Sequence, residues 1–147
     1  MNKKENYEML LQQVESLVAG ETNWVGVLAN VTAAIHDTMH FFWVGFYLVQ
    51  GKELVLGPFQ GSVACFRIPC NKGVCGTAWS RRETVIVEDV DQFPGHIACS
   101  SLSRSEIVVP IFNQSGEVIA VLDIDSKDYN SFDEIDRNYL EQITLSN

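Results

Sequence analysis

The 147-residue sequence contains no long apolar run. No stretch approaches the roughly 18 consecutive apolar residues that a membrane-spanning helix needs. The opening MNKKENYEML carries charges where a secretory signal would have an apolar region. We therefore expect a cytoplasmic protein without a membrane segment.

Basic residues are scarce as well. The chain has 10 Lys and Arg against 19 Asp and Glu, which gives a formal net charge of −9. A charge of this sign repels both the phosphate backbone of nucleic acids and anionic lipid headgroups. We therefore expect neither nucleic acid nor a membrane surface as a partner.

Internal repeats, low-complexity tracts and linker-like stretches are also absent, so nothing in the sequence marks a domain boundary. A chain of 147 residues with 46% hydrophobic content suits one compact core rather than two. We expect a single domain over residues 1–147.

Helical periodicity is clearest near the two ends of the chain. Apolar residues recur at helical spacing within residues 7–18 and again within residues 24–39, after a cap at Thr22 or Asn23. A last helix is expected after the S-x-x-E capping box of Ser131 and Glu134.

β-Branched and aromatic residues predict strands in the middle of the chain. Residues 41–49 and 53–59 are expected to form one hairpin. Residues 105–126 read as a second hairpin around a turn at Asn113–Gly116, and Pro110 indicates an edge or an irregularity in its first strand. Shorter elements are expected as strands at 64–68 and 84–89, a turn at 73–76 and a brief helix at 77–82.

Strands joined mostly by hairpins, with helices gathered at the chain ends, are typical of an α+β domain with an antiparallel sheet. The segment from Pro69 to Ser105 is the least regular part, and it contains Cys70, Cys75 and Cys99. Irregular segments carried on a rigid sheet are common places for functional sites.

Four cysteines, Cys65, Cys70, Cys75 and Cys99, allow three interpretations. They could be small buried hydrophobic residues. They could bind a metal, with Cys99 or His96 as the fourth ligand, although the spacing matches neither paired zinc ligands nor plant-type iron–sulfur sites. They could also perform redox chemistry, in which one thiolate attacks an electrophile and a second thiol resolves the product as a disulfide.

Six strings along the chain carry a family resemblance. The strings WVGFYL, GPFQG, ACFRIP, KGVCGTA, HIACSSLSRSEIVVPI and VLDIDS resemble the GAF-domain free methionine-(R)-sulfoxide reductases. The resemblance implies a GAF-like antiparallel sheet with flanking helices. It implies reduction of free methionine-(R)-sulfoxide to methionine, with no cofactor and no metal.

The resemblance also assigns roles to three of the four cysteines. It implies that Cys99 is the nucleophile and that Cys65 and Cys75 are resolving partners, while Cys70 has no role. Cys99 would become a sulfenic acid as methionine leaves, Cys65 or Cys75 would close a disulfide, and an external dithiol such as thioredoxin would reduce it.

Acidic and aromatic residues would complete the site by the same resemblance. Glu106, Asp123 and Asp125 would line a pocket, one as proton donor to the sulfoxide oxygen and the others as partners of the substrate ammonium. Trp43 and Tyr47 project to one face of a strand and would enclose the methylsulfinyl group. We expect these carboxylates to raise the pKa of the Cys99 thiol.

Weaker expectations concern the rest of the site and the assembly. Backbone amides of residues 73–76 could receive the substrate carboxylate. His96 could be a local base, but we favour its interpretation as a bystander. Related domains suggest a homodimer. The competing hypothesis is a GAF-type sensor that binds a small ligand without chemistry; such a protein would keep its ligand after removal of Cys65, Cys75 and Cys99.

Overall fold

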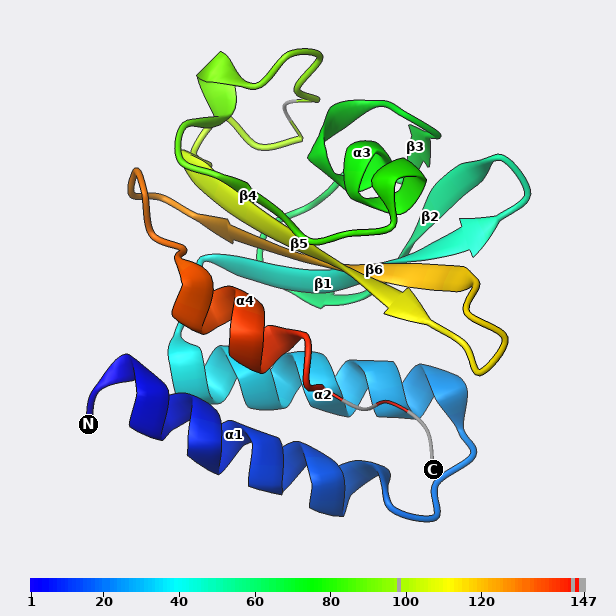
Figure 1. Cartoon of the computed structure of the whole chain (residues 1–147), viewed down its shortest axis with the longest axis vertical. Coiled ribbons are helices and arrows are strands. Elements are labelled where there is room, and N and C mark those ends of the chain that lie inside the picture. Colours follow the sequence, from blue (N-terminus) through cyan, green and yellow to red (C-terminus); the bar gives the residue numbers. More distant parts are fainter. Residues whose placement is uncertain (98, 144, 146–147) are drawn as a thin grey trace.

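A six-stranded antiparallel sheet forms the centre of the computed structural model, which describes residues 1–97, 99–143 and 145 (Figure 1). The strand order is β3-β2-β1-β6-β5-β4, and each neighbouring pair is antiparallel. The strands are β1 (Trp43–Gln50), β2 (Glu53–Gln60), β3 (Arg67–Pro69), β4 (Val85–Val87), β5 (Ser105–Phe112) and β6 (Val118–Ser126).

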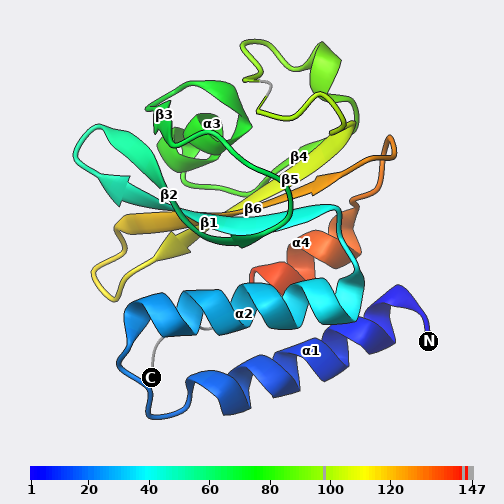
Figure 2. The ribbon, with the colours of Figure 1, turned by 180° about the vertical axis from the view of Figure 1, so that it is seen from behind.

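Helices cover both faces of this sheet. Three helices, α1 (Lys3–Val18), α2 (Trp24–Met39) and α4 (Glu134–Leu140), lie on one side, and α3 (Gly73–Arg81) lies on the other with a long irregular segment (Figures 1 and 2). That segment includes a single 3-10 turn at Val90–Gln92. The expected α+β class is therefore confirmed. None of the helices in the described ranges has the length and apolar character that crossing a bilayer requires.

Both predicted hairpins are confirmed. β1 pairs with β2, and β5 pairs with β6 around a turn in which the Asn113 side chain accepts hydrogen bonds from the Ser115 and Glu117 amides. Pro110 pairs with Val121 of β6. On its other edge β5 pairs with β4 only as far as Val108, so the N–H that Pro110 lacks breaks no hydrogen bond to β4.

Two helix starts differ from the sequence prediction. α3 begins at Gly73 rather than after Gly76, because the expected turn is the first turn of the helix itself. α4 is capped by Asp133 and Asp136, which exchange the two hydrogen bonds of a capping box. Ser131 is not the cap, since its hydroxyl lies 2.6 Å from that of Ser126. The strand expected at 64–68 is also shorter and later, at Arg67–Pro69.

The two faces of the sheet build two separate cores. Side chains alternate along each strand, so that Val44, Phe46 and Leu122 pack with the layer of α1, α2 and α4. Trp43 and Tyr47 point to the opposite face and pack with α3. The same alternation turns the acidic side chains of β5 and β6 toward α3, and this is where a pocket forms.

Candidate active site

A pocket lies on the α3 face of the sheet, between the strands, the start of α3 and two connecting segments. It gathers residues from β1, α3, the β2–β3 connection, the segment before β5, β5 and β6. The chemically distinctive lining residues are Trp43, Tyr47, Cys75, His96, Cys99, Ser103, Glu106, Asp123 and Asp125. The site residues expected from the sequence thus all line the pocket except Cys65, which is bonded to a lining residue.

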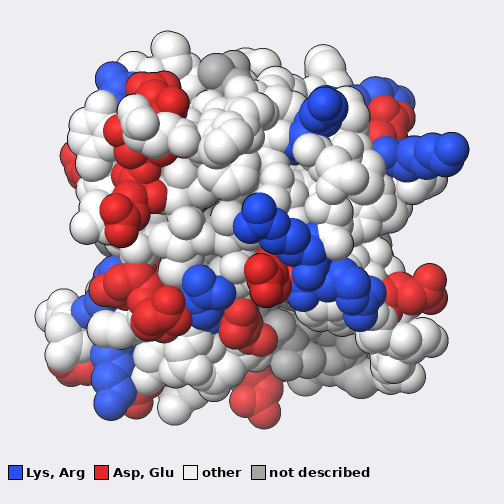
Figure 3. Space-filling model, turned by 45° about the horizontal axis from the view of Figure 1, so that its top comes forward, with Lys and Arg blue, Asp and Glu red and all other residues white. Residues whose placement is uncertain are grey.

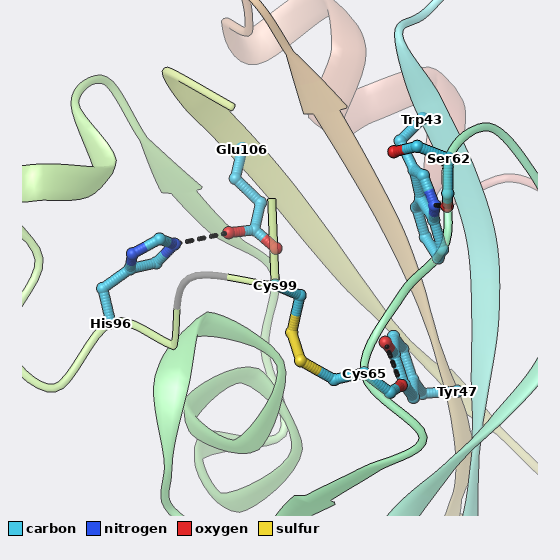
Figure 4. Close-up of a disulfide and its surroundings, with 7 residues drawn as sticks. All are labelled: Trp43, Tyr47, Ser62, Cys65, His96, Cys99 and Glu106. Atoms are coloured by element: carbon cyan, nitrogen blue, oxygen red, sulfur yellow. Dashed lines mark hydrogen bonds and ion pairs between the residues drawn. A yellow bond between two sulfur atoms is a disulfide. The ribbon is translucent and has the colours of Figure 1, made fainter. Parts of the chain in front are cut away.

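A disulfide joins Cys65 to Cys99 at this pocket (Figure 4). The two Cα atoms are 5.4 Å apart although 34 residues separate them in sequence. The bond connects the β2–β3 segment to the segment that precedes β5. While this bond is closed, each sulfur is bonded to the other and neither can serve as a thiolate ligand to a metal.

Cys75 is a buried free thiol in the first turn of α3. Burial raises the pKa of this thiol, and the charges of Asp123 and Glu106 raise it further. Cys75 is therefore protonated near neutral pH. The acidic strands therefore act on Cys75 in this structure, while Cys99, bonded to Cys65, has no thiol to titrate.

Three carboxylates lie on neighbouring strands below Cys75. Glu106 on β5 stands opposite Asp125 on β6, while Asp123 is flanked by Val108 and Gly45. Burial raises the pKa of all three side chains, and Asp123 adds to this effect for Glu106 and Asp125. One carboxylate oxygen of Asp123 is buried without a hydrogen-bond partner. This site favours protons, or a cation that enters from outside.

His96 lines the pocket, and its role stays a prediction. Its Nε2 atom is 3.9 Å from an oxygen of Glu106 (Figure 4). Burial lowers the pKa of the imidazole, so a neutral ring stands beside Glu106 at neutral pH. The sequence signal was only the spacing of three residues between His96 and Cys99, and the packing of the irregular segment decides the contact.

Trp43 and Tyr47 form the aromatic wall of the pocket. Their rings stack with centroids 6.2 Å apart, and Phe59 also stacks with Trp43, at 5.2 Å. The indole N–H donates to the carbonyl of Ser62 at 2.9 Å, and the Tyr47 hydroxyl donates to the carbonyl of Cys65 at 2.8 Å. The aromatic residues thus contact the segment that carries the disulfide.

Two cysteines remain free, and they have different surroundings. Cys70 is half-buried and is not among the residues that line the pocket. Cys75 has its sulfur within 4.8 Å of carboxylate oxygens of Glu106 and Asp123, and this is the group of described residues whose ligand atoms are close enough to hold a metal ion.

Two carboxylates of the pocket are buried and do not belong to the charged outer surface of the molecule. In the view that brings the α3 side forward, many acidic side chains gather at the left, while at the centre and the right basic and acidic side chains lie next to one another (Figure 3). Glu106 and Asp123 are each only 6% exposed. A ligand therefore meets these carboxylates only after it enters the pocket.

Comparison with known proteins identifies the family. A profile of the GAF domain matches residues 21–145. The chain is 61% identical to GAF domain-containing protein A of Dictyostelium discoideum, over 97% of this chain and 90% of that protein. It is 47% identical to the free methionine-R-sulfoxide reductase of Saccharomyces cerevisiae, over 97% of this chain and 84% of that protein.

A solved structure agrees with these relatives. The free methionine-R-sulfoxide reductase of Neisseria meningitidis, in complex with its substrate, superimposes with a TM-score of 0.94 at 54% identity, over 97% of this chain and 86% of that chain. The chain therefore belongs to the GAF domain family and, within it, to the free methionine-R-sulfoxide reductases.

Proposed function

We propose that this protein reduces free methionine-(R)-sulfoxide to methionine. The observation that carries the proposal is the Cys65–Cys99 disulfide beside a pocket lined by buried carboxylates and two aromatic rings. The names of its relatives at 47% and 54% identity support the same activity.

The reaction needs a nucleophilic sulfur and two protons. The thiolate of Cys99 attacks the sulfoxide sulfur, the S–O bond of the substrate breaks, and the protonated oxygen passes to the Cys99 sulfur. Methionine leaves, and Cys99 is then a sulfenic acid. The thiol of Cys65 then attacks the sulfur of that sulfenic acid. The disulfide forms, and the displaced hydroxide takes up the thiol proton and leaves as water. The substrate gains two electrons, and the two thiols lose them.

Cys65, rather than Cys75, closes the first disulfide in our proposal. The structure already joins Cys65 to Cys99, whereas burial and neighbouring acids keep Cys75 protonated and a protonated thiol is a poor nucleophile. Cys75 would act as the second resolving partner, through later thiol–disulfide exchange.

The three carboxylates would divide proton donation and cation binding. Glu106 and Asp125 carry strongly raised pKa values, so either can remain protonated at neutral pH; we assign donation to the sulfoxide oxygen to Glu106. Asp123 has a buried, unpartnered oxygen and would bind the substrate ammonium together with Asp125.

The remaining contacts would fix the substrate at its other end. Trp43 and Tyr47 would enclose the methylsulfinyl group, because sulfur packs well against aromatic rings. The substrate carboxylate would meet backbone amides at the start of α3, where Lys72 provides no side-chain cap.

The cycle also needs a reductant and a compartment that supplies it. We propose that a thioredoxin-type dithiol reduces the disulfide in the cytoplasm.

We also propose that residues 1–147 act as one domain and that the protein is a homodimer. Sedimentation equilibrium at micromolar concentration would test the oligomeric state.

A substrate panel tests the proposed function. The purified protein is incubated with dithiothreitol and with free methionine-(R)-sulfoxide, free methionine-(S)-sulfoxide or N-acetylmethionine sulfoxide, and the free or N-acetylated methionine formed is quantified. Turnover of the free R epimer alone is expected, and the carboxylates exclude the N-acetylated compound because it lacks the ammonium. If none of the three is reduced but calorimetry detects binding of methionine, and binding survives removal of Cys65, Cys75 and Cys99, the protein is a ligand sensor.

A further inference from the structure

The β2–β3 connection, residues 61–66, holds Cys65 in place although much of it lies outside the core. We call these residues the Cys65 segment. Its two largest side chains are solvent-exposed, at 84% for Val63 and 77% for Phe66. They therefore provide little packing that could fix the position of the Cys65 sulfur, and the segment needs other contacts.

Those contacts come from buried aromatic side chains of β1. The hydroxyl of Tyr47 donates to the Cys65 carbonyl, and the indole N–H of Trp43 donates to the Ser62 carbonyl (Figure 4). A backbone bond from Leu56 to the carbonyl of Phe66 fixes the far end of the segment. The two side-chain bonds thus fix the part that carries the sulfur.

The donors are themselves held rigidly. Tyr47 and Trp43 are only 2% and 4% exposed, and the Trp43 ring stacks with the rings of both Tyr47 and Phe59. Burial raises the pKa of the Tyr47 hydroxyl, so the hydroxyl keeps its proton and remains a donor. A rigid donor positions its acceptor without a large entropic cost at each turnover.

The path of the segment over the indole supports the same conclusion. Gly61 has a φ of +142°, and a Cβ atom there would lie 2.4 Å from Cδ1 of Trp43. Only glycine combines this backbone angle with such a close approach. The Cys65 segment therefore passes close against the pyrrole part of the Trp43 indole before it reaches the disulfide.

We propose that Tyr47 and Trp43 are positioning residues for the resolving step: their hydrogen bonds hold the Cys65 segment so that the Cys65 sulfur meets Cys99. This inference rests on the proposed reductase cycle. It gives β1 a second role, in which the side chains expected to enclose the substrate also fix the thiol that resolves the sulfenic acid.

Removal of one hydroxyl tests the inference. Tyr47→Phe keeps the ring but loses the bond to the Cys65 carbonyl, and Tyr129→Phe makes the same change at an exposed residue as a matched control. In single-turnover experiments, methionine release reports the first step and thiol loss reports disulfide closure. We expect closure to slow on the order of threefold to tenfold, as for one lost neutral hydrogen bond, with a smaller effect on methionine release.

The sulfenic acid supplies a readout that general destabilisation would not produce. Dimedone should trap more Cys99 sulfenic acid in Tyr47→Phe than in the parent or in Tyr129→Phe. When Cys65 is replaced by Ser, the Tyr47 hydroxyl has no thiol left to position. Adding Tyr47→Phe to that variant should then no longer change the lifetime of the sulfenic acid. Equal slowing of both steps, or an additive effect in that background, would overturn the inference.

A redox equilibrium separates this inference from the proposed function. Glutathione disulfide oxidises the two protein thiols to the Cys65–Cys99 disulfide and is itself reduced to two glutathione molecules. We expect the equilibrium constant for closure to fall on the order of threefold to tenfold in Tyr47→Phe and to stay unchanged in Tyr129→Phe. A fall without any sulfoxide turnover would disprove only the reductase, and turnover without a fall would disprove only the positioning role.

Discussion

Glu106 and Asp125 stand directly opposite each other on β5 and β6, as a cross-strand pair of carboxylates. Like charges at such positions destabilise a sheet, and both side chains lie in the buried surroundings that raise their pKa values. Ionisation of the pair therefore destabilises the folded state. For the same reason the site can hold a proton at neutral pH.

Glu106→Gln should make the folded protein more stable at neutral pH while it removes the proposed proton donor. The folded state raises the pKa of Glu106 above its ordinary value of 4.5, so it binds the proton more tightly than the unfolded chain does. Stability then falls as pH rises from the ordinary value to the raised one. Urea unfolding from pH 4 to 8 should show a gain for Glu106→Gln at pH 7 that vanishes near about pH 4.

The exposed side chain of Glu15 on α1 provides the matched control for this experiment. Glu15→Gln should leave the pH dependence of unfolding as it is in the parent protein. If Glu106→Gln is less stable than the parent at every pH, burial of the Glu106 charge is not a cost to folding and the assignment of a retained proton is wrong.

Much of the fold was predictable because its signals are local. Strand alternation and the turn at Asn113–Gly116 lie within a few residues of one another, so the hairpins could be read directly. The pairing of β1 with β6 joins segments far apart in the chain and has no local signal. The turn from β3 into α3 brings the chain back on itself so closely that a Cβ on Gly76 would lie 2.8 Å from the carbonyl oxygen of Pro69.

The site was predictable to the extent that strand alternation fixes side-chain direction. Asp123 and Asp125 had to share a face, and the family resemblance supplied the cysteines. Neither could choose between Cys65 and Cys75 as the partner of Cys99, because that choice depends on how an irregular segment folds. The same dependence hid the approach of His96 to Glu106.

Cys99→Ser should abolish sulfoxide turnover, because serine offers no thiolate and cannot form the sulfenic acid. Cys70→Ser makes the same sulfur-to-oxygen change at a thiol outside the pocket-lining set, and it should barely change turnover. The measurement is methionine formed per minute with dithiothreitol in excess. Full activity in Cys99→Ser would refute the assignment of the nucleophile.

Cys65→Ser and Cys75→Ser should differ in how fast thiols disappear after one equivalent of substrate. Without Cys65 the partner bonded to Cys99 in the structure is missing, and closure should slow by more than about tenfold, since Cys75 is protonated and poorly nucleophilic. Cys75→Ser should close the Cys65–Cys99 disulfide at a rate close to that of the parent. Peptide mapping of the quenched samples identifies the bonded pair, and a dominant Cys75–Cys99 bond in the parent would reverse the assignment.

Tyr7→Phe should lower stability without lowering turnover. The Tyr7 hydroxyl is buried and donates to the carboxylate of Asp136, which also accepts from Lys3 at 2.7 Å. A hydrogen bond to a charged, buried group contributes about 2 kcal/mol, so urea unfolding at pH 7 should show a loss of about this size. This network joins α1 to α4 on the side of the sheet opposite the pocket (Figure 1). Activity at 25 °C should therefore match the parent, and a parallel loss of turnover would mean that the helical layer controls the geometry of the site through the sheet.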